Sequence, residues 1–324
     1  MKKQQFIDKV NDLALKKISF LFIMDFEKKI PIVLTKNEAL DKNILFKVGD
    51  QINYKPLKKI NKKSIYIQKF PMDKNEYLMA FNKVQYHLRK GNTYLLNLTF
   101  PTKVLINETL EDIFHYADSN YKILMKDYFL SYSPECFIKI KNNKIFSYPM
   151  KGTISSLIEN AKRKIIDDKK ELWEHSTIVD LIRNDLALFA SKIKVNRFRY
   201  IEEVSSDKSS LFQVSSEVQG DLPFNWQSKL GDLIWGMLPA GSVSGAPKEK
   251  TLEIIRSVEK GSRGYYSGVY GYFDGFSLDS AVSIRFIENA KDGYYYRSGG
   301  GITANSEFEN EFDELLRKIY VPTF

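Results

Sequence analysis

The sequence predicts an α+β protein built on antiparallel β-sheet. Strand-like and helix-like segments occur in blocks along the 324 residues, without the strict alternation of a doubly wound parallel fold. Hydrophobic residues make up 43% of the chain and aromatic residues 14%, so a substantial core can form. A Lys-rich, weakly patterned stretch near 50–72 predicts a short N-terminal segment, residues 1–72, packed on a main domain, residues 73–324.

Hydrophobic periodicity and turn residues give the elements in order. In the N-terminal segment we expect a helix over 2–17 and strands over 18–26 and 44–49. Six further helices are expected near 73–90, 108–118, 170–189, 225–237, 247–259 and 306–320. The remaining strands are expected over 93–106 (interrupted by Pro101), 128–133, 135–141, 144–149, 192–204, 211–220, 265–273, 279–288 and 293–301.

Charge and cysteine content exclude several classes of protein. The chain has 49 basic and 40 acidic residues, but its lysines are spread thinly and the densest run, 55–63, has no interleaved aromatics. We therefore expect no nucleic-acid partner, whereas a local basic site for an anionic substrate stays open. One cysteine, Cys136, and three histidines exclude a disulfide framework and a Cys/His metal cluster. No run approaches the ~20 apolar residues of a membrane helix, and no signal peptide is visible, so we expect a cytoplasmic protein.

Two predicted helices carry glutamate pairs on or beside their buried faces. In the helix over 170–189 the apolar stripe, extended backwards, meets Glu171 and Glu174. The final helix carries Glu311 and Glu314, followed by Lys318. These could be solvated glutamates near helix ends. Buried carboxylates, however, need a partner, and two pairs without a histidine suit a hard cation such as Mg²⁺.

Two glycine-rich segments and one lysine complete the candidate chemistry. Gly299, Gly300 and Gly301 stand between a strand and the final helix, and 239–248 runs into a helix start; each is either a tight turn or a backbone anion site. Lys151 precedes Gly152 after a strand, so it is either solvated or a partly dry nucleophile or base. Glu135 begins a strand and could act as a general acid, while Cys136 beside it should point to the core.

Together these motifs resemble the chorismate-utilising enzymes. The segments that carry the resemblance, over about 73–320, are SPECF (133–137), PMKGT (149–153), EHSTIVDLIRND (174–185), PAGSVSGAPK (239–248), RGYYSGVYGYF (263–273), SIRF (283–286) and GGGITANSEFENEFDELLRK (299–318). The resemblance implies two antiparallel β-sheets packed as a sandwich and ringed by helices.

The resemblance also implies roles for individual residues. Glu174 and Glu314 would bind Mg²⁺, with Glu171 and Glu311 behind them. Lys151 would be the covalent nucleophile and Glu135 the general acid. The substrate-binding residues would be Gly152, Thr153, Ser244, Tyr266, Arg285, Gly299, Gly300, Gly301 and Lys318.

Lys151 and Leu95 indicate which branch of the family the chain is most similar to. Lys151 is typical of aminodeoxychorismate synthases, whereas anthranilate synthases usually have Ala there. Leu95 replaces the water-activating lysine of the isochorismate and salicylate synthases. Both Leu95 and Gln213 depart from the branch, which often has Gln at the first position and usually His at the second.

The resemblance therefore implies Mg²⁺-dependent conversion of chorismate and ammonia to 4-amino-4-deoxychorismate, in the synthesis of para-aminobenzoate for folate. Because Cys136 is expected in a core strand, a separate glutamine amidotransferase subunit would supply the ammonia. Two alternatives stay open: an anthranilate synthase component I, and a basic binding protein without enzymatic activity.

Overall fold

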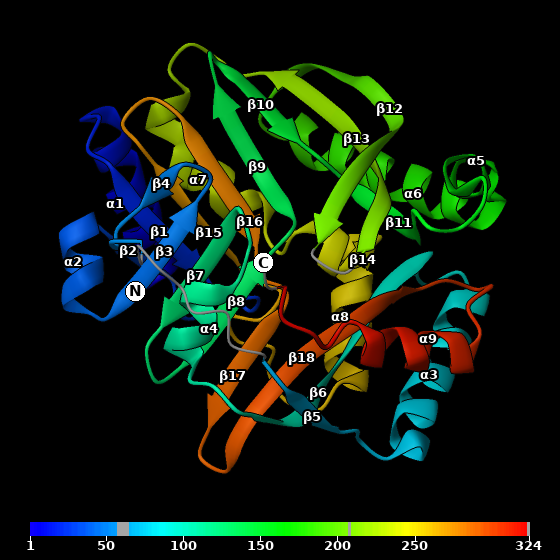
Figure 1. The fold of residues 1–324 in the computed structure, drawn as a ribbon. Coiled ribbons are helices and arrows are strands. Elements are labelled where there is room, and N and C mark those ends of the chain that lie inside the picture. The colour runs from blue at the N-terminus through cyan, green and yellow to red at the C-terminus, as the bar shows by residue number, and fades with distance from the viewer. Residues whose placement is uncertain (57–64, 207–208, 323–324) are drawn as a thin grey trace.

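The computed structural model describes residues 1–56, 65–206 and 209–322, and it has the predicted α+β architecture with two large antiparallel sheets (Figure 1). The strands of the first sheet are β1 (Phe20–Met24), β2 (Ile32–Leu34), β9 (Cys136–Lys141), β10 (Lys144–Ser147), β11 (Met150–Ser155), β12 (Ser191–Ser206), β13 (Ser209–Asp221), β15 (Val269–Phe273) and β16 (Leu278–Val282). They lie in the order β11-β13-β10-β9-β16-β15-β1-β2, and β12 pairs with β13.

The other strands described form the second sheet of the sandwich. They are β3 (Ile44–Val48), β4 (Gln51–Ile52), β5 (Ile67–Phe70), β6 (Leu95–Ile106), β7 (Tyr121–Met125), β8 (Phe129–Ser133), β14 (Gly245–Ala246), β17 (Phe286–Ala290) and β18 (Gly293–Ile302). Their order is β14-β6-β18-β17-β8-β7-β3-β4, and β5 pairs with β6.

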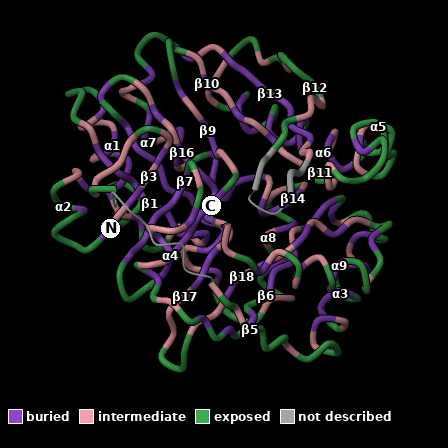
Figure 2. The backbone as a smooth tube through the Cα atoms, viewed as in Figure 1, coloured by how far each residue is buried: buried purple, intermediate pink, exposed green. Residues whose placement is uncertain are grey.

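Helices cover the outer faces of both sheets. They are α1 (Lys3–Leu15), α2 (Lys36–Asp41), α3 (Lys74–Arg89), α4 (Leu110–Tyr116), α5 (Ala161–Asp167), α6 (Lys169–Ala187), α7 (Leu230–Met237), α8 (Lys248–Val258) and α9 (Phe308–Arg317), with 3-10 turns η1 (Trp226–Lys229) and η2 (Gly241–Val243). None of the helices described is both long and apolar enough to cross a membrane. The central strands are buried along most of their length, whereas α5 is largely exposed (Figure 2).

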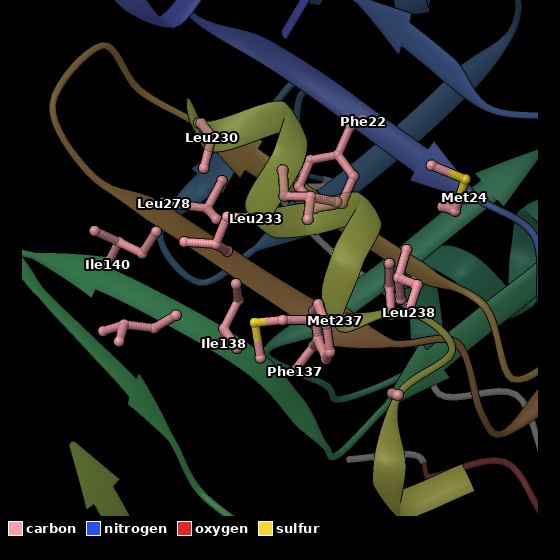
Figure 3. Packing of buried hydrophobic residues seen from close by; sticks show 14 of the residues in the cluster. Phe22, Met24, Phe137, Ile138, Ile140, Leu230, Leu233, Met237, Leu238 and Leu278 are labelled. Carbon is pink, nitrogen blue, oxygen red and sulfur yellow. The ribbon is translucent and has the colours of Figure 1, made fainter. Parts of the chain in front are cut away.

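The core follows from the alternation of side chains along the strands. On one face of the first sheet, α7 packs Leu233 and Met237 against Phe22 of β1, Ile138 of β9 and Leu278 of β16 (Figure 3). The opposite face of β1 contributes Leu21 and Ile23 to a second cluster, which includes Ile123 and Phe129 of the other sheet. Burying each such side chain stabilises the fold by roughly 1.5–3 kcal/mol, so this cluster joins the two sheets.

Residues 1–72 are built into both sheets and do not form a segment merely packed on the outside. Strand β1 lies between β15 and β2, with Phe20 opposite Phe273, and β3 pairs with β7 in the second sheet. The expected boundary near 50–72 has no counterpart in the pairing, because β4 and β5, which both lie within this stretch, belong to the same sheet. The basic run at 55–63 falls mainly in 57–64, outside the described residues.

Two expectations about single elements were wrong. Strand β6 continues through Pro101. One edge of β6 pairs with β18, and the other edge pairs with β14 at one end and with β5 at the other end. Between these two ends Pro101 faces no partner strand among the described residues, so its missing N–H breaks no ladder hydrogen bond there. The segment 279–288 forms two strands in different sheets, joined at a crossover that contains Arg285 with φ of 51°. The strand expected over 293–301 is confirmed as β18, and Gly299–Gly301 lie inside it, opposite Thr99, Leu98 and Asn97, which excludes the alternative of a tight turn. Sequence patterning also missed the short strands β7 and β11 and the helix α5.

Candidate active site

A cavity of about 140 Å³ brings together residues from both sheets and from the segments that connect them. Eight residues that the sequence singled out line it: Glu135, Lys151, Ser244, Tyr266, Arg285, Gly299, Gly301 and Lys318. They come from the start of β9, from β11, from the end of η2, from the segment before β15 (Tyr266), from the crossover after β16, and from β18 and the end of α9. Leu95 of β6 also lines the cavity and is 4% exposed.

The three glycines of β18 allow side chains to approach this strand from two directions. Strand β17 pairs only with residues 293–297 of β18, so one edge of Gly299–Gly301 has no partner strand. A Cβ atom at position 300 would lie 3.3 Å from Oε2 of Glu311 and 3.8 Å from Oε1 of Glu314. A Cβ atom at position 301 would lie 3.5 Å from Nζ of Lys151. Larger residues would therefore push against the charged groups on both sides.

The two glutamate pairs, far apart in the sequence, lie close to each other near the glycines of β18. Lys151 Nζ lies 2.8 Å from Oε2 of Glu174 on α6, and Lys318 Nζ lies 2.7 Å from Oε1 of Glu314 on α9. The ammonium group of Lys170 lies 3.9 Å from Oε1 of Glu174 and 3.9 Å from Oε1 of Glu311. One exposed lysine thus spans the two helices.

Burial and charge act in opposite directions on these groups. Burial raises the pKa of Glu171 and of Glu311, and the neighbouring carboxylates add to the effect. Burial alone would lower the pKa of Lys151, but the carboxylates of Glu174, Glu314 and Glu171 together outweigh it, so the net pKa is raised. For Glu314 the burial effect is likewise outweighed, here by Lys318, and its pKa is lowered.

The carboxylates have the chemistry of a hard-cation site. Oε2 of Glu171 and Oε1 of Glu174 are buried and have no hydrogen-bond donor among the described residues. Oxygen-only donors are what Mg²⁺ prefers, and it commonly takes few protein ligands when a charged substrate completes its shell. Over residues 1–56, 65–206 and 209–322, no three Asp, Glu, His or Cys side chains are close enough together to hold an ion alone. The residues fit a cation that is shared with substrate.

Glu135 lines the cavity, whereas the other four glutamates singled out from the sequence do not. The hydroxyl of Ser242 donates a hydrogen bond to Oε1 of Glu135. Burial raises the pKa of Glu135, although Ser242 and the positive charge of Arg285 act against this. A carboxyl with a raised pKa keeps its proton to higher pH, which favours the role of a general acid. Cys136 points away, as expected, and packs against the cluster between the sheets.

Tyr266, just before β15, and Arg285, in the crossover between β16 and β17, both line the cavity. Tyr266 is 3% exposed, and burial raises the pKa of its phenol to about 12, so the group is neutral. The Nε atom of Arg285 is buried without a hydrogen-bond partner in the described chain. A buried donor without a partner is costly, so this atom is available for an anionic ligand.

The predicted residues outside the cavity lining are Gly152, Thr153, Glu171, Glu174, Gly300, Glu311 and Glu314. Thr153 is exposed and pairs with Gln213 across β11 and β13. Gly152 has φ of 82°, and a Cβ there would lie 2.9 Å from Oε2 of Glu171, so glycine leaves room for that carboxylate. Ser244 lines the cavity, but its hydroxyl donates to the carbonyl of Ala240 at 2.8 Å.

Sequence reasoning missed the groups that hold the site together. Asp185, placed by the helix pattern on the buried face of α6, accepts two hydrogen bonds from Lys248, at 2.7 and 2.8 Å. Arg263 donates to the carbonyls of Val243 and Asn97 at 2.7 and 2.6 Å, and so ties the loop after η2 to β6. Their positions in the quoted motifs were the available signal, but their partners are distant in sequence. Arg297 and Ser298, just before the glycines, also line the cavity.

The comparisons with known proteins agree with this fold and with the predicted resemblance. The family model described as "chorismate binding enzyme" matches residues 15–323. An uncharacterised PabA-like protein of Pasteurella multocida is 46% identical over 322 residues, covering 99% of each chain. The aminodeoxychorismate synthase component 1 of Salmonella typhimurium is 30% identical, covering 76% of this chain and 57% of the relative.

Two further comparisons, one with a protein sequence and one with a crystal structure, show the same similarity. Anthranilate synthase component 1 of Acetivibrio thermocellus is 31% identical, and the match covers 76% of this chain and 52% of that protein. The chain thus spans little more than half the length of these two named enzymes. A crystal structure of a putative 2,3-dihydroxybenzoate-specific isochorismate synthase from Bacillus anthracis superposes with a TM-score of 0.71 at 17% identity, over 98% of this chain and 86% of that one. The chain belongs to the chorismate-binding enzyme family.

Proposed function

We propose that this enzyme converts chorismate and ammonia to 4-amino-4-deoxychorismate. The observation that carries the proposal is the position of Lys151, whose amine reaches the cavity beside Gly301, while Glu135 lines the same cavity. An amine and a carboxyl held in one cavity can attack and protonate a single ring. The similarity to aminodeoxychorismate synthases of 30% identity supports the same reaction class.

The charged groups of the cavity would bind the two carboxylates of chorismate. Magnesium, when bound, would be held by Glu174 and Glu314, with Glu171 and Glu311 behind them, and would supply positive charge for one substrate carboxylate. Tyr266, Arg285 and the backbone of Gly299–Gly301 would receive the other polar groups of the substrate, and Lys318 would neutralise Glu314. The unpartnered Nε of Arg285 and the open edge of β18 support these assignments.

The chemical step would proceed as two displacements. The neutral amine of Lys151 forms a bond to C2 of the ring, both conjugated ring double bonds move by one position, and the C4–O bond breaks, so that the hydroxyl leaves as water with a proton from Glu135. Ammonia then forms a bond to C4, both double bonds move back, and the C2–N bond breaks, with the lysine nitrogen taking up the proton that the added ammonia gives up. The ion pair with Glu174 holds Lys151 protonated, so the amine must lose a proton before it attacks.

The ammonia would come from a separate glutamine amidotransferase subunit. Such enzymes use a reactive cysteine, and burial raises the pKa of the single thiol, Cys136, which packs between the sheets. Free ammonium at high concentration should therefore replace glutamine in an assay of this chain alone. The relatives named PabA-like do not identify this partner.

A second candidate is anthranilate synthase component I, because the similarity to such an enzyme is 31% identity. The test is to incubate the protein with chorismate, Mg²⁺ and ammonium and to analyse the products by mass spectrometry. Aminodeoxychorismate without pyruvate supports the proposal. Fluorescent anthranilate with an equal amount of pyruvate would reject the proposal and support anthranilate synthase, the second candidate. Salt-dependent nucleic-acid binding without chorismate consumption would exclude both enzymes.

A further inference from the structure

Lys170, the second residue of α6, lies between the two glutamate pairs but has no role in the proposed reaction. Its Nζ atom is 3.9 Å from Oε1 of Glu174 on the same helix and 3.9 Å from Oε1 of Glu311 on α9. Both distances are within the range of an ion pair but are too long for a hydrogen bond. The ammonium group is therefore held by charge and not by a directional bond, so another cation can displace it.

The two helices that carry the glutamate pairs have almost no polar contact with each other. Helix α6 packs against β11, β12 and β13 of the first sheet, whereas α9 packs against β18 of the second sheet (Figure 1). Every residue of both helices is described, and the ion pair of Lys170 with Glu311 is the only hydrogen bond or salt bridge between them. Lys170 thus connects the two halves of the proposed metal site.

The position of Lys170 is unfavourable for the helix itself. Asp168 is the N-cap of α6, so Lys170 lies in the first turn, where the helix dipole opposes a positive charge. A lysine four residues before a glutamate also has the less favourable orientation of such a pair. Local helix energetics therefore does not explain the pairing, and the attraction of the Glu311 carboxylate from the other helix must contribute to it.

The charges around Lys170 favour a further cation. When ionised, the glutamates of the two pairs carry four negative charges, and Lys151 and Lys318 balance two of them through ion pairs of 2.8 and 2.7 Å. Lys170 supplies one more positive charge, but its side chain is 48% exposed, so it can turn to solvent. Oε1 of Glu174, which faces Lys170, is buried and accepts no hydrogen bond among the described residues. A buried carboxylate oxygen of this kind suits a divalent cation.

We propose that Lys170 is a displaceable counter-ion: its ammonium group stabilises the two glutamate pairs in the metal-free protein and turns to solvent when a divalent cation binds there. The inference rests on the magnesium site of the proposed function and adds a residue that limits how tightly this site holds its metal. Because the metal must displace a positive charge that is already present, its affinity without substrate is low. The metal therefore binds firmly only together with the substrate, whose carboxylates supply further negative charge.

The test compares the wild-type protein with Lys170→Gln, which removes the charge, and with Lys170→Arg, which keeps it. Mn²⁺ is the probe, because its electron paramagnetic resonance signal reports the free ion, and competition by Mg²⁺ gives the affinity for magnesium; chorismate is absent. Exposed ion pairs are weak, so Lys170→Gln should bind either metal about 3- to 10-fold more tightly than wild type. Lys170→Arg should bind like wild type, and the difference between Lys170→Gln and wild type should decrease at high ionic strength.

Thermal unfolding of the metal-free protein is a second measurement, independent of activity. Without metal, Lys170→Gln should unfold roughly 1–3 °C below wild type, because the carboxylates lose a counter-ion, and Mg²⁺ should raise its melting temperature more than that of wild type. Lys169→Gln removes the same charge from the adjacent exposed position and is the matched control, which should behave as wild type in both measurements.

A double-mutant cycle identifies the partner of Lys170. Glu311→Gln removes the carboxylate that Lys170 reaches on α9. In this background Lys170→Gln should tighten metal binding by a smaller factor than it does in the wild-type background, because the two side chains interact.

The direction of the change separates displacement from a structural role, because structural damage would weaken metal binding. Equal or weaker binding by Lys170→Gln would overturn the inference and leave the proposed function standing if wild type still forms aminodeoxychorismate. Failure of wild type and Lys170→Gln alike to bind Mn²⁺ or Mg²⁺ would overturn the inference together with the magnesium site. The expected binding in a protein that does not aminate chorismate would support the inference and reject the proposed reaction.

Discussion

The ammonium group of Lys151 lies 2.8 Å from the carboxylate of Glu174. The same carboxylate is our proposed magnesium ligand, so the proposed nucleophile and the proposed metal site share one group. In the metal-free protein this pairing keeps the lysine charged and unreactive. A cation bound to Glu174 competes with the ammonium group for the carboxylate, so metal binding and release of the amine should be coupled.

Replacing Lys151 with alanine should abolish the covalent intermediate. Wild type incubated with chorismate and Mg²⁺ but without ammonium should gain the mass of chorismate less one water, on the peptide that contains Lys151. Lys151→Ala should show no adduct and should form aminodeoxychorismate on the order of 100-fold more slowly or worse, because the amine is deleted. Chorismate binding should persist, since the carboxylate contacts are elsewhere. Lys169→Ala, an exposed lysine on α6, is the control. An adduct on another residue, or an alanine variant as fast as wild type, would favour direct amination.

Replacing Glu174 or Glu314 with glutamine should remove magnesium dependence together with activity. Each substitution deletes a charged oxygen ligand, and even groups behind a metal ligand cost 10–100-fold in affinity or activity, so we expect a loss of at least about 100-fold. Calorimetry should show weaker Mg²⁺ binding, and Mg²⁺ with chorismate should no longer raise the melting temperature. Asp313→Asn, exposed on the same helix as Glu314, should behave as wild type. Near-normal turnover of both glutamine variants at saturating Mg²⁺ would show that these residues bind no metal.

Replacing Glu135 with glutamine should reduce activity while raising stability at neutral pH. Burial raises the pKa of Glu135 above the unfolded value, so the folded protein holds the proton to higher pH. Its stabilising contribution is present below the unfolded pKa and is lost as pH rises through the folded pKa. Glutamine imitates the protonated form at every pH but cannot donate the proton, so kcat should fall about 100-fold or more while the melting temperature at pH 8 rises. In wild type, activity should decline as pH rises through the pKa of Glu135. If activity of the glutamine variant still declines at high pH as it does in wild type, Glu135 is not the general acid.

His175 should make the fold sensitive to acid. It is fully buried, its Nε2 lies 2.6 Å from Oγ of Ser216, and burial lowers its pKa to about 4. Between about pH 6.5 and pH 4 the unfolded chain takes up a proton that the folded chain does not, so the free energy of unfolding falls as pH falls. The expected loss between pH 7 and pH 5 is about 2 kcal/mol, measured by urea unfolding. His175→Gln should lose this part of the pH dependence. If the free energy of unfolding changes with pH equally in both proteins, a group other than His175 takes up the proton.

Much of this protein could be predicted from local sequence patterns. Helical periodicity placed α3, α6 and α9 to within a few residues, and the pair Asn142-Asn143, both with positive φ, marks the predicted turn between β9 and β10. These features depend on residues that are close in the sequence, within one or two turns of a helix or within one β-turn. The glutamate pairs were visible for the same reason, because carboxylates at helical spacing interrupt an apolar stripe.

Which residues meet was decided only by the tertiary structure. The crossover at Arg285 transfers the chain from one sheet to the other, and no periodicity in 279–288 marks it, since both halves read as strand. The position of Gly299–Gly301 inside β18 depends on pairing with β6, about 200 residues earlier. The sequence by itself determined the elements, the residue types and the family resemblance, because these depend on local order. The ion pair of Lys151 with Glu174, the raised pKa of that lysine and the place of Lys170 between two helices depend on long-range contacts and burial, which only the folded chain fixes.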